Sequence, residues 1–144
     1  LDIFETCTEL GRPGISASFE DVQTVTRALA RLDVEFQKEN PVTSLFTNDR
    51  NGDLNPEVLG ERVLSALVEF EIPVSRVPEL VEALEEAGKT VDTVFSAALA
   101  EPIRPGESEP ELIQILEENG IFYRPNGKTN VGLGKPFLPV EAAS

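Results

Sequence analysis

Apolar side chains recur every three or four residues along much of the chain, and this is the spacing at which an α-helix returns to the same face. The first such run follows Ser18, a residue suited to cap a helix, and stops before Asn40-Pro41. The second follows Asn55-Pro56, a pair typical of a helix start, and stops at Pro73. Three further runs have similar boundaries. The spacing predicts helices over about 19–38, 56–70, 76–87, 90–101 and 109–119.

Local signals support the ends of these helices. Ser75 and Ser108 are each expected to cap a helix, the second through a capping box that reaches Glu111. Gly88 and Gly120 are expected to end helices in the left-handed conformation that glycine adopts without strain. These expected helices therefore begin or end at residues that favour a helix boundary.

The connections between successive helices are short, at 71–75 and 88–90, and short links place helices side by side and antiparallel. Residues 1–17 look irregular, and 41–55 read as a loop that is dense in turn formers. The predicted fold class is mainly α, with about five helices in a compact, antiparallel, bundle-like body over residues 1–119.

The character of the sequence changes after residue 120. Asn126-Gly127 lies between two short runs over 121–133, and Asn-Gly is the strongest local signal for a β-hairpin. Residues 134–140 form an extended, apolar tail. A lone hairpin is marginal in water, so it needs support, and residues 1–4 could supply a third strand. Residues 120–144 are therefore not expected to form a domain of their own.

Charge divides the chain at the same point. The net charge is −14, from 26 acidic and 12 basic residues. Residues 120–144 are instead basic, because Arg124, Lys128 and Lys135 outnumber Glu141. Opposite potentials favour docking of the tail on an acidic body, in the same chain or in a neighbour. The overall acidity argues against direct binding of nucleic acid, which needs a basic surface.

The composition excludes several kinds of site. Without histidine there is no His-based catalytic triad or imidazole metal site, and Cys7 alone allows no disulfide within the chain and no thiolate zinc site. No apolar run is long enough to span a membrane, and no secretory signal is seen. The expected location is the cytoplasm or a soluble particle, with no membrane partner and no cofactor.

In one segment, side chains with oxygen ligands stand at every second position, as they do in a calcium-binding loop. Asp49, Asn51 and Asp53 match the first three ligand positions of an EF-hand. Leu54 stands where the loop needs glycine, and Gly60 where it needs a bidentate glutamate. A turn that leads into a helix cap explains the segment better, so calcium is the weaker interpretation.

No catalytic group stands out from the surface. Glu82 and Glu86 lie one helical turn apart, as an acid–base pair could, but they lie opposite the apolar face of their expected helix, where solvated carboxylates are normal. Ser75 and Thr90 read as caps, and no histidine is present to activate them. We therefore expect no enzymatic activity; a carboxylate-based enzyme is the least favoured alternative.

These observations favour a non-enzymatic assembly or adaptor protein that forms a homo-oligomer or joins a larger complex. Its expected outline is similar to small connector proteins that build rings in viral particles. The alternative is an acidic inhibitor, or a nucleic-acid mimic, that binds a basic surface. The contacts are expected from the hairpin and tail, at Tyr123, Arg124, Lys128, Lys135, Phe137, Leu138 and Val140.

Overall fold

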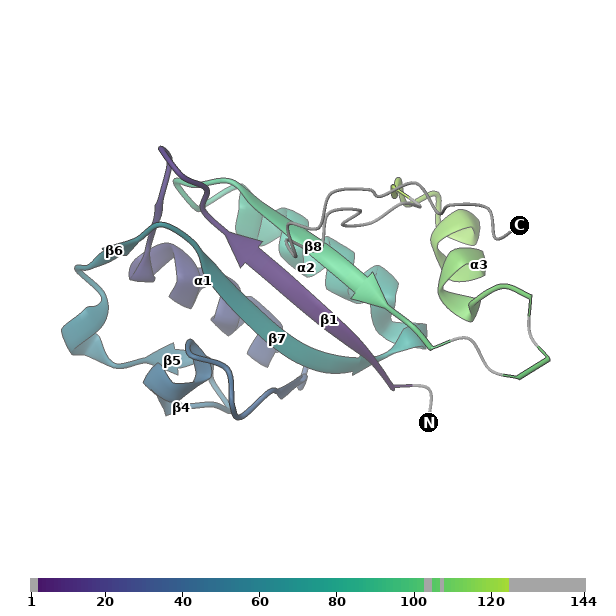
Figure 1. Cartoon of the computed structure of the whole chain (residues 1–144), viewed down its shortest axis with the longest axis horizontal. Helices are drawn as coiled ribbons and strands as arrows, with labels where there is room; N and C mark the ends of the chain where they lie inside the picture. Colours follow the sequence, from purple (N-terminus) through teal and green to yellow (C-terminus); the bar gives the residue numbers. More distant parts are fainter. Residues whose placement is uncertain (1–2, 103–104, 107, 125–144) are drawn as a thin grey trace, which may run out of the picture.

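The computed structural model describes residues 3–102, 105–106 and 108–124, and for 3–5 it describes the backbone only. Its centre is an antiparallel sheet of four strands, in the order β3-β7-β1-β8. Figure 1 labels the last three of these strands. The strands are β1 (Ile3–Leu10), β3 (Glu35–Phe36), β7 (Ala66–Pro73) and β8 (Phe95–Ala100).

Two helices lie behind this sheet in Figure 1, and a third lies beyond one end of it. They are α1 (Phe19–Ala30), α2 (Val77–Gly88) and α3 (Glu111–Glu118). Helix α1 connects β1 to β3, and α2 connects β7 to β8. This βαββαβ order, with β1 and β7 at the centre, is the split βαβ topology of ferredoxin-like folds.

Smaller elements lie outside the main sheet and the helices, most of them in the long connection from β3 to β7. Two short strand pairs and three 3₁₀ turns complete the described part of the fold. The pairs are β2 (Ala17–Ser18) with β6 (Arg62–Val63), and β4 (Phe46–Asn48) with β5 (Asp53–Leu54); the turns are Thr43–Leu45, Pro56–Val58 and Val74–Arg76.

The core lies between the sheet and helices α1 and α2. Along β7 the buried residues alternate with exposed or half-buried ones, as expected for a strand with one covered face. Helices α1 and α2 each turn an apolar stripe toward this face. The fully buried large residues of the core are Leu10, Val22, Val25, Leu29, Leu54, Val68, Phe70, Ile72, Val77 and Leu80.

The predicted fold class is wrong, because the structure is a mixed α/β fold and not mainly α. The predicted helix over 56–70 is instead a 3₁₀ turn followed by β6 and the first part of β7. The predicted helix over 90–101 is β8. Pro73 therefore ends a strand. The similarity in outline to ring-forming connectors rested on a helical body, and the architecture gives it no support.

The first segment also differs from expectation. Residues 1–17 contain the central strand β1, so they are not irregular, and β1 pairs with β7 and β8. The loop expected over 41–55 includes the β4–β5 pair. Residues 121–124 have no strand structure, and the rest of the predicted hairpin and tail lies outside the described residues.

Three predicted helices are present, with corrected ends. Ser18 caps α1, as the sequence indicated. The structure adds a capping box between Ser18 and Asp21, and α1 ends at Ala30 and not near 38. Ser75 and Ser108 do not cap α2 and α3, and Gly88 is not left-handed. Gly120 has a φ of 64°, and the N–H of Ile121 donates to the carbonyl of Leu116, as in a glycine-ended helix.

Candidate functional site: an open strand edge

Strand β8 forms one edge of the main sheet and pairs only with β1 among the described residues. The N–H of Gly11 donates to the carbonyl of Val94 at 2.8 Å, which identifies this pair as hydrogen-bonded across the ladder. Hydrogen-bonded and non-bonded pairs alternate in an antiparallel ladder. The backbone groups of Phe95, Ala97 and Leu99 therefore point away from β1, toward the open edge.

The side chains of β8 do not protect this edge. Natural proteins usually guard an edge strand with charge, proline or a very short length. Strand β8 is six residues long, FSAALA, with neither charge nor proline. Four of these residues, Ser96, Ala97, Ala98 and Ala100, are exposed. Strand β8 is therefore suited to accept another strand.

The loop before β8 is fixed to the start of α1, which holds the edge in place. The N–H of Asp92 donates to the Asp21 carboxylate at 2.9 Å. The hydroxyl of Thr93 donates to the carbonyl of Ser16 at 2.6 Å. Burial favours a higher pKa for the Asp21 carboxyl, but hydrogen bonds from Ser18 and Asp92 and the charge of Arg62 hold that pKa below its ordinary 3.8.

Exposed apolar side chains gather near the beginning of β8. Ile15, Leu64 and Val94 are 48%, 69% and 44% exposed. The backbone of Gly11 lies between two of them, because its N–H bonds to Val94 and a Cβ at this glycine would sit 2.7 Å from the carbonyl oxygen of Leu64. We call these three residues the apolar corner. It extends the open edge with a surface that water does not favour.

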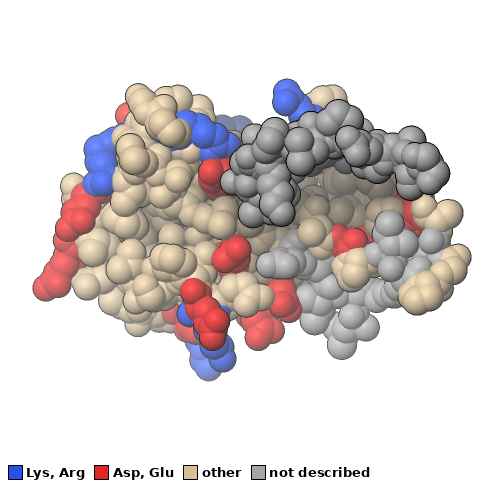
Figure 2. All heavy atoms as spheres, viewed as in Figure 1, with Lys and Arg blue, Asp and Glu red and all other residues tan. Residues whose placement is uncertain are grey.

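The uncovered face of the sheet is acidic. Glu35, Glu69 and Glu71 lie on it beside Glu9, and Figure 2 shows acidic side chains near the middle of this view. Two of these carboxylates are held by amides. Asn40 Nδ2 donates to Glu69 Oε2 at 2.8 Å, and Gln37 Nε2 donates to Glu71 Oε1 at 2.9 Å. A cationic segment would be attracted to this face.

Of the predicted contact residues, the structure describes two. The hydroxyl of Tyr123 donates to Glu117 Oε1 at 3.2 Å, and its ring packs against the core. Partial desolvation, that hydrogen bond and the nearby carboxylates raise the pKa of the Tyr123 hydroxyl. Arg124 is exposed, and so is Phe122 (87%), which the sequence reasoning missed. Lys128, Lys135, Phe137, Leu138 and Val140 lie outside the described residues.

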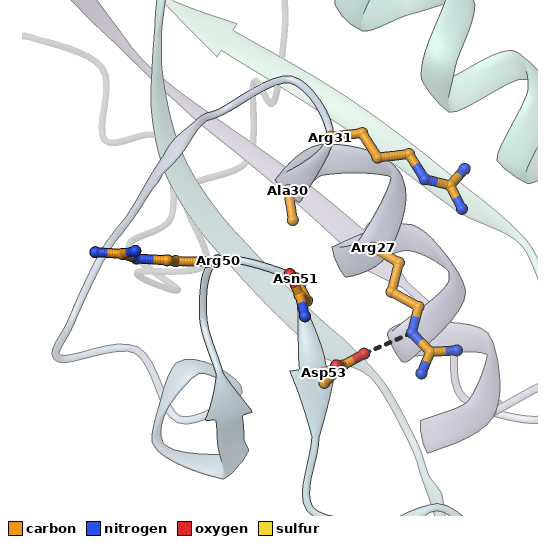
Figure 3. Close-up of a pocket in the computed structure, with 6 residues that line it drawn as sticks. All are labelled: Arg27, Ala30, Arg31, Arg50, Asn51 and Asp53. Carbon is orange, nitrogen blue, oxygen red and sulfur yellow. Dashed lines mark hydrogen bonds and ion pairs between the residues drawn. The ribbon is translucent and has the colours of Figure 1, made fainter.

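The predicted calcium segment forms the turn between β4 and β5. Asp53 Oδ1 accepts a hydrogen bond from Arg27 Nε at 2.7 Å, and Asn51 and Asp53 line a hollow whose other walls include three arginines (Figure 3). This surrounding positive charge disfavours a cation. Within residues 3–102, 105–106 and 108–124, no group of three or more Cys, Asp or Glu side chains is arranged to hold a metal ion.

The other candidate groups lie apart from the β8 edge. Glu82 and Glu86 are exposed on α2, and Glu86 forms an ion pair with Lys89. Cys7 is half-buried on the uncovered sheet face, opposite Glu69 and Ala98 in the neighbouring strands. None of the helices in the described part of the chain is both long and apolar enough to cross a membrane.

We compared the chain with known proteins and found no relative. The chain matches no protein-family model, no curated protein and no solved structure.

Proposed function

We propose that this protein is a non-enzymatic assembly or adaptor protein, and that the edge of β8 is its contact surface. The observation that carries the proposal is the unguarded strand: six uncharged residues whose outer backbone groups have no partner among the described residues. An edge of this kind recognises an extended segment by completing the sheet, and the backbone hydrogen bonds supply much of the affinity.

The occupant of this edge is residues 125–144 of a neighbouring copy. This segment contains the run Thr129–Leu133, which has the length of a strand, followed by the apolar Phe137, Leu138 and Val140. Lys128 and Lys135 complement the carboxylates of the uncovered sheet face. Twenty residues follow Arg124, which at about 3.3 Å per residue is ample to reach a second molecule.

If each copy binds residues 125–144 of a neighbour at its β8 edge, the same contact repeats and builds an assembly. Each copy offers one edge and one segment, so the contact is heterologous and can close into a ring or dimer. The apolar corner lies at the beginning of β8 and would be covered by the same neighbour. The resulting homo-oligomer can in turn join other proteins into a larger complex.

The solution mass tests this proposal. Light scattering after size exclusion should give a multimer for the full chain and a monomer for a chain that ends at Arg124. A matched control replaces Lys89 with glutamine, because this exposed cation lies at the end of α2 and its loss should leave the mass unchanged. A full chain that stays monomeric at every concentration, or a multimer that survives the truncation, would contradict the proposal.

The acidic sheet face favours a second candidate function. Glu9, Glu35, Glu69 and Glu71 share one surface, which suits an inhibitor or regulator that occupies a basic, nucleic-acid-binding surface of another protein. Such binding should weaken steeply as salt rises, because salt screens exposed charges. A complex that depends on the β8 edge should instead weaken only in part, because its backbone hydrogen bonds remain when salt screens Lys128 and Lys135.

A further inference from the structure

The hollow beside α1 concentrates positive charge in a strongly acidic protein. Its lining residues are Arg27, Ala30, Arg31, Arg50, Asn51 and Asp53, and its volume is about 280 Å³. Three of the twelve basic residues of the chain therefore surround one small space, with one carboxylate among them. The lining carries a net charge of +2, opposite in sign to the chain as a whole.

The floor of the hollow is rigid, because the β4–β5 turn is tied to α1. The hydroxyl of Thr26 donates to the carbonyl of Gly52 at 2.7 Å, and the N–H of Leu54 donates to Gln23 Oε1 at 3.0 Å. Gly52 has a φ of 70°, and a Cβ there would lie 2.3 Å from the carbonyl oxygen of Thr26. Only glycine allows this close approach, so the turn and the helix form one platform.

The three arginines differ in whether a carboxylate of the chain already binds them. Arg27 gives its Nε to Asp53, which leaves its terminal nitrogens to donate elsewhere. Arg31 and Arg50 are exposed, and no acidic partner for either is found among the described residues. In Figure 3 the side chains of Arg27 and Arg31 extend to the same side, whereas Arg50 extends the other way from the turn. An exposed arginine changes rotamer within nanoseconds, so Arg50 can close over a ligand.

We propose that this hollow binds a small molecule that carries a phosphate group. Arg27 lies in the last turn of α1 and Arg31, four residues later, is its C-cap, so their side chains are close enough to clamp one phosphate. The C-terminal end of α1 carries a partial negative charge of about half a unit, which repels an anion. The net charge of +2 on the lining residues is larger and opposite in sign. The hollow has few apolar walls and no aromatic ring, so the recognised part is the phosphate itself.

The experiment is a titration of the full chain with pyrophosphate, followed by nuclear magnetic resonance at low salt. We expect saturable shifts at the arginine Nε–H groups of the hollow and at the amides of Asn51 and Gly52. Arg31→Gln with Arg50→Gln should weaken binding about tenfold or more, because two charge-assisted donors are lost. Both side chains are exposed, so the variant should keep its fold, and thermal unfolding checks this.

A control variant with the same loss of charge separates the site from general attraction. Lys89→Gln with Arg124→Gln removes two exposed cations that do not line the hollow, and it should bind pyrophosphate as the native chain does. The proposal is overturned if this control weakens binding equally, or if the shifts do not saturate. It is also overturned if sulfate binds as well as pyrophosphate, or if a short oligonucleotide binds far more tightly at the same residues.

Discussion

The two edges of the main sheet are built in opposite ways. Strand β3 is two residues long and places the charged Glu35 on the uncovered face. Strand β8 is six residues long and carries no charge. A short, charged edge resists the addition of another strand, and a long, uncharged edge invites it. The same sheet is thus protected on one side and open on the other, and this difference supports our proposal that another strand pairs with β8.

The contrast extends to the residues around each edge. Near β3, the amides of Gln37 and Asn40 bind Glu71 and Glu69, so polar groups there are satisfied within the chain. Near the start of β8, Ile15, Leu64 and Val94 expose apolar surface instead. Four sets of variants, all in or beside β8, test this contrast.

Proline substitutions in β8 should have the largest effects. The position of the proline should decide whether the stability of the fold or the association of copies is lost. Ala98 bonds to β1, so Ala98→Pro removes a ladder hydrogen bond and should destabilise the fold by about 2–4 kcal/mol. Ala97 points its N–H outward, so Ala97→Pro should keep the fold and abolish association. Urea unfolding and light scattering measure the two effects. Equal loss of stability in both variants would refute the assignment of the outer groups.

Loss of the Asp21 carboxylate should loosen the entry to β8. Because the pKa of Asp21 is lowered in the folded chain, its stabilisation is present above the ordinary pKa of 3.8 and is lost as pH falls through the folded pKa. Asp21→Asn should lower the free energy of unfolding by about 1–2 kcal/mol at pH 7. The difference from the native chain should shrink at pH 3. A difference that is the same at both pH values would disprove this origin.

Removal of a buried hydroxyl should strengthen the attachment of β8. Thr8 lies opposite Ala97 in the ladder, is fully buried, and its hydroxyl has no partner within the described residues. Thr8→Val keeps the shape and removes the unsatisfied group, so it should raise the free energy of unfolding by about 1 kcal/mol. Thr8→Ser keeps the hydroxyl, loses a methyl group and should be destabilising. Thermal unfolding ranks them, and a stabilising serine would contradict this reasoning.

Added charge on β8 should give the smallest and most specific effect. Ala98 is exposed on the uncovered face, where Glu35 protects the other edge. Ala98→Lys should repel a basic segment, and Ala98→Glu should attract it. Association should therefore be about two- to fivefold weaker for lysine than for glutamate, the range of an exposed ion pair. The reverse order, measured by sedimentation, would mean that the occupant of the edge is acidic.

Sequence patterns predicted the helices that have strong local signals. These signals are the Ser18 cap and the apolar stripes of α1, α2 and α3. Each involves only a few neighbouring residues, so it does not depend on the rest of the fold. Strands β1 and β8 were missed for two different reasons. Thr6 and Thr8 are polar residues on the buried face of β1, so they hide its alternation. Strand β8 is rich in alanine, the strongest helix former.

Strand β7 could have been recognised from its sequence. Ala66, Val68, Phe70 and Ile72 alternate with less buried positions that include Glu69 and Glu71, which is a period of two. The open edge could not be predicted, because it depends on strand order, a property of the whole sheet. The hollow beside α1 brings together residues 27–31 and 50–53, and only the tertiary fold places them side by side.

The most direct test is hydrogen exchange at the backbone amides of β8 in the full chain, at high and at low protein concentration. The amides of Ser96, Ala98 and Ala100 face β1 and serve as an internal reference. We expect the amides of Phe95, Ala97 and Leu99 to be protected at high concentration and to exchange rapidly on dilution. Rapid exchange of these three amides at every concentration would contradict assembly through the β8 edge.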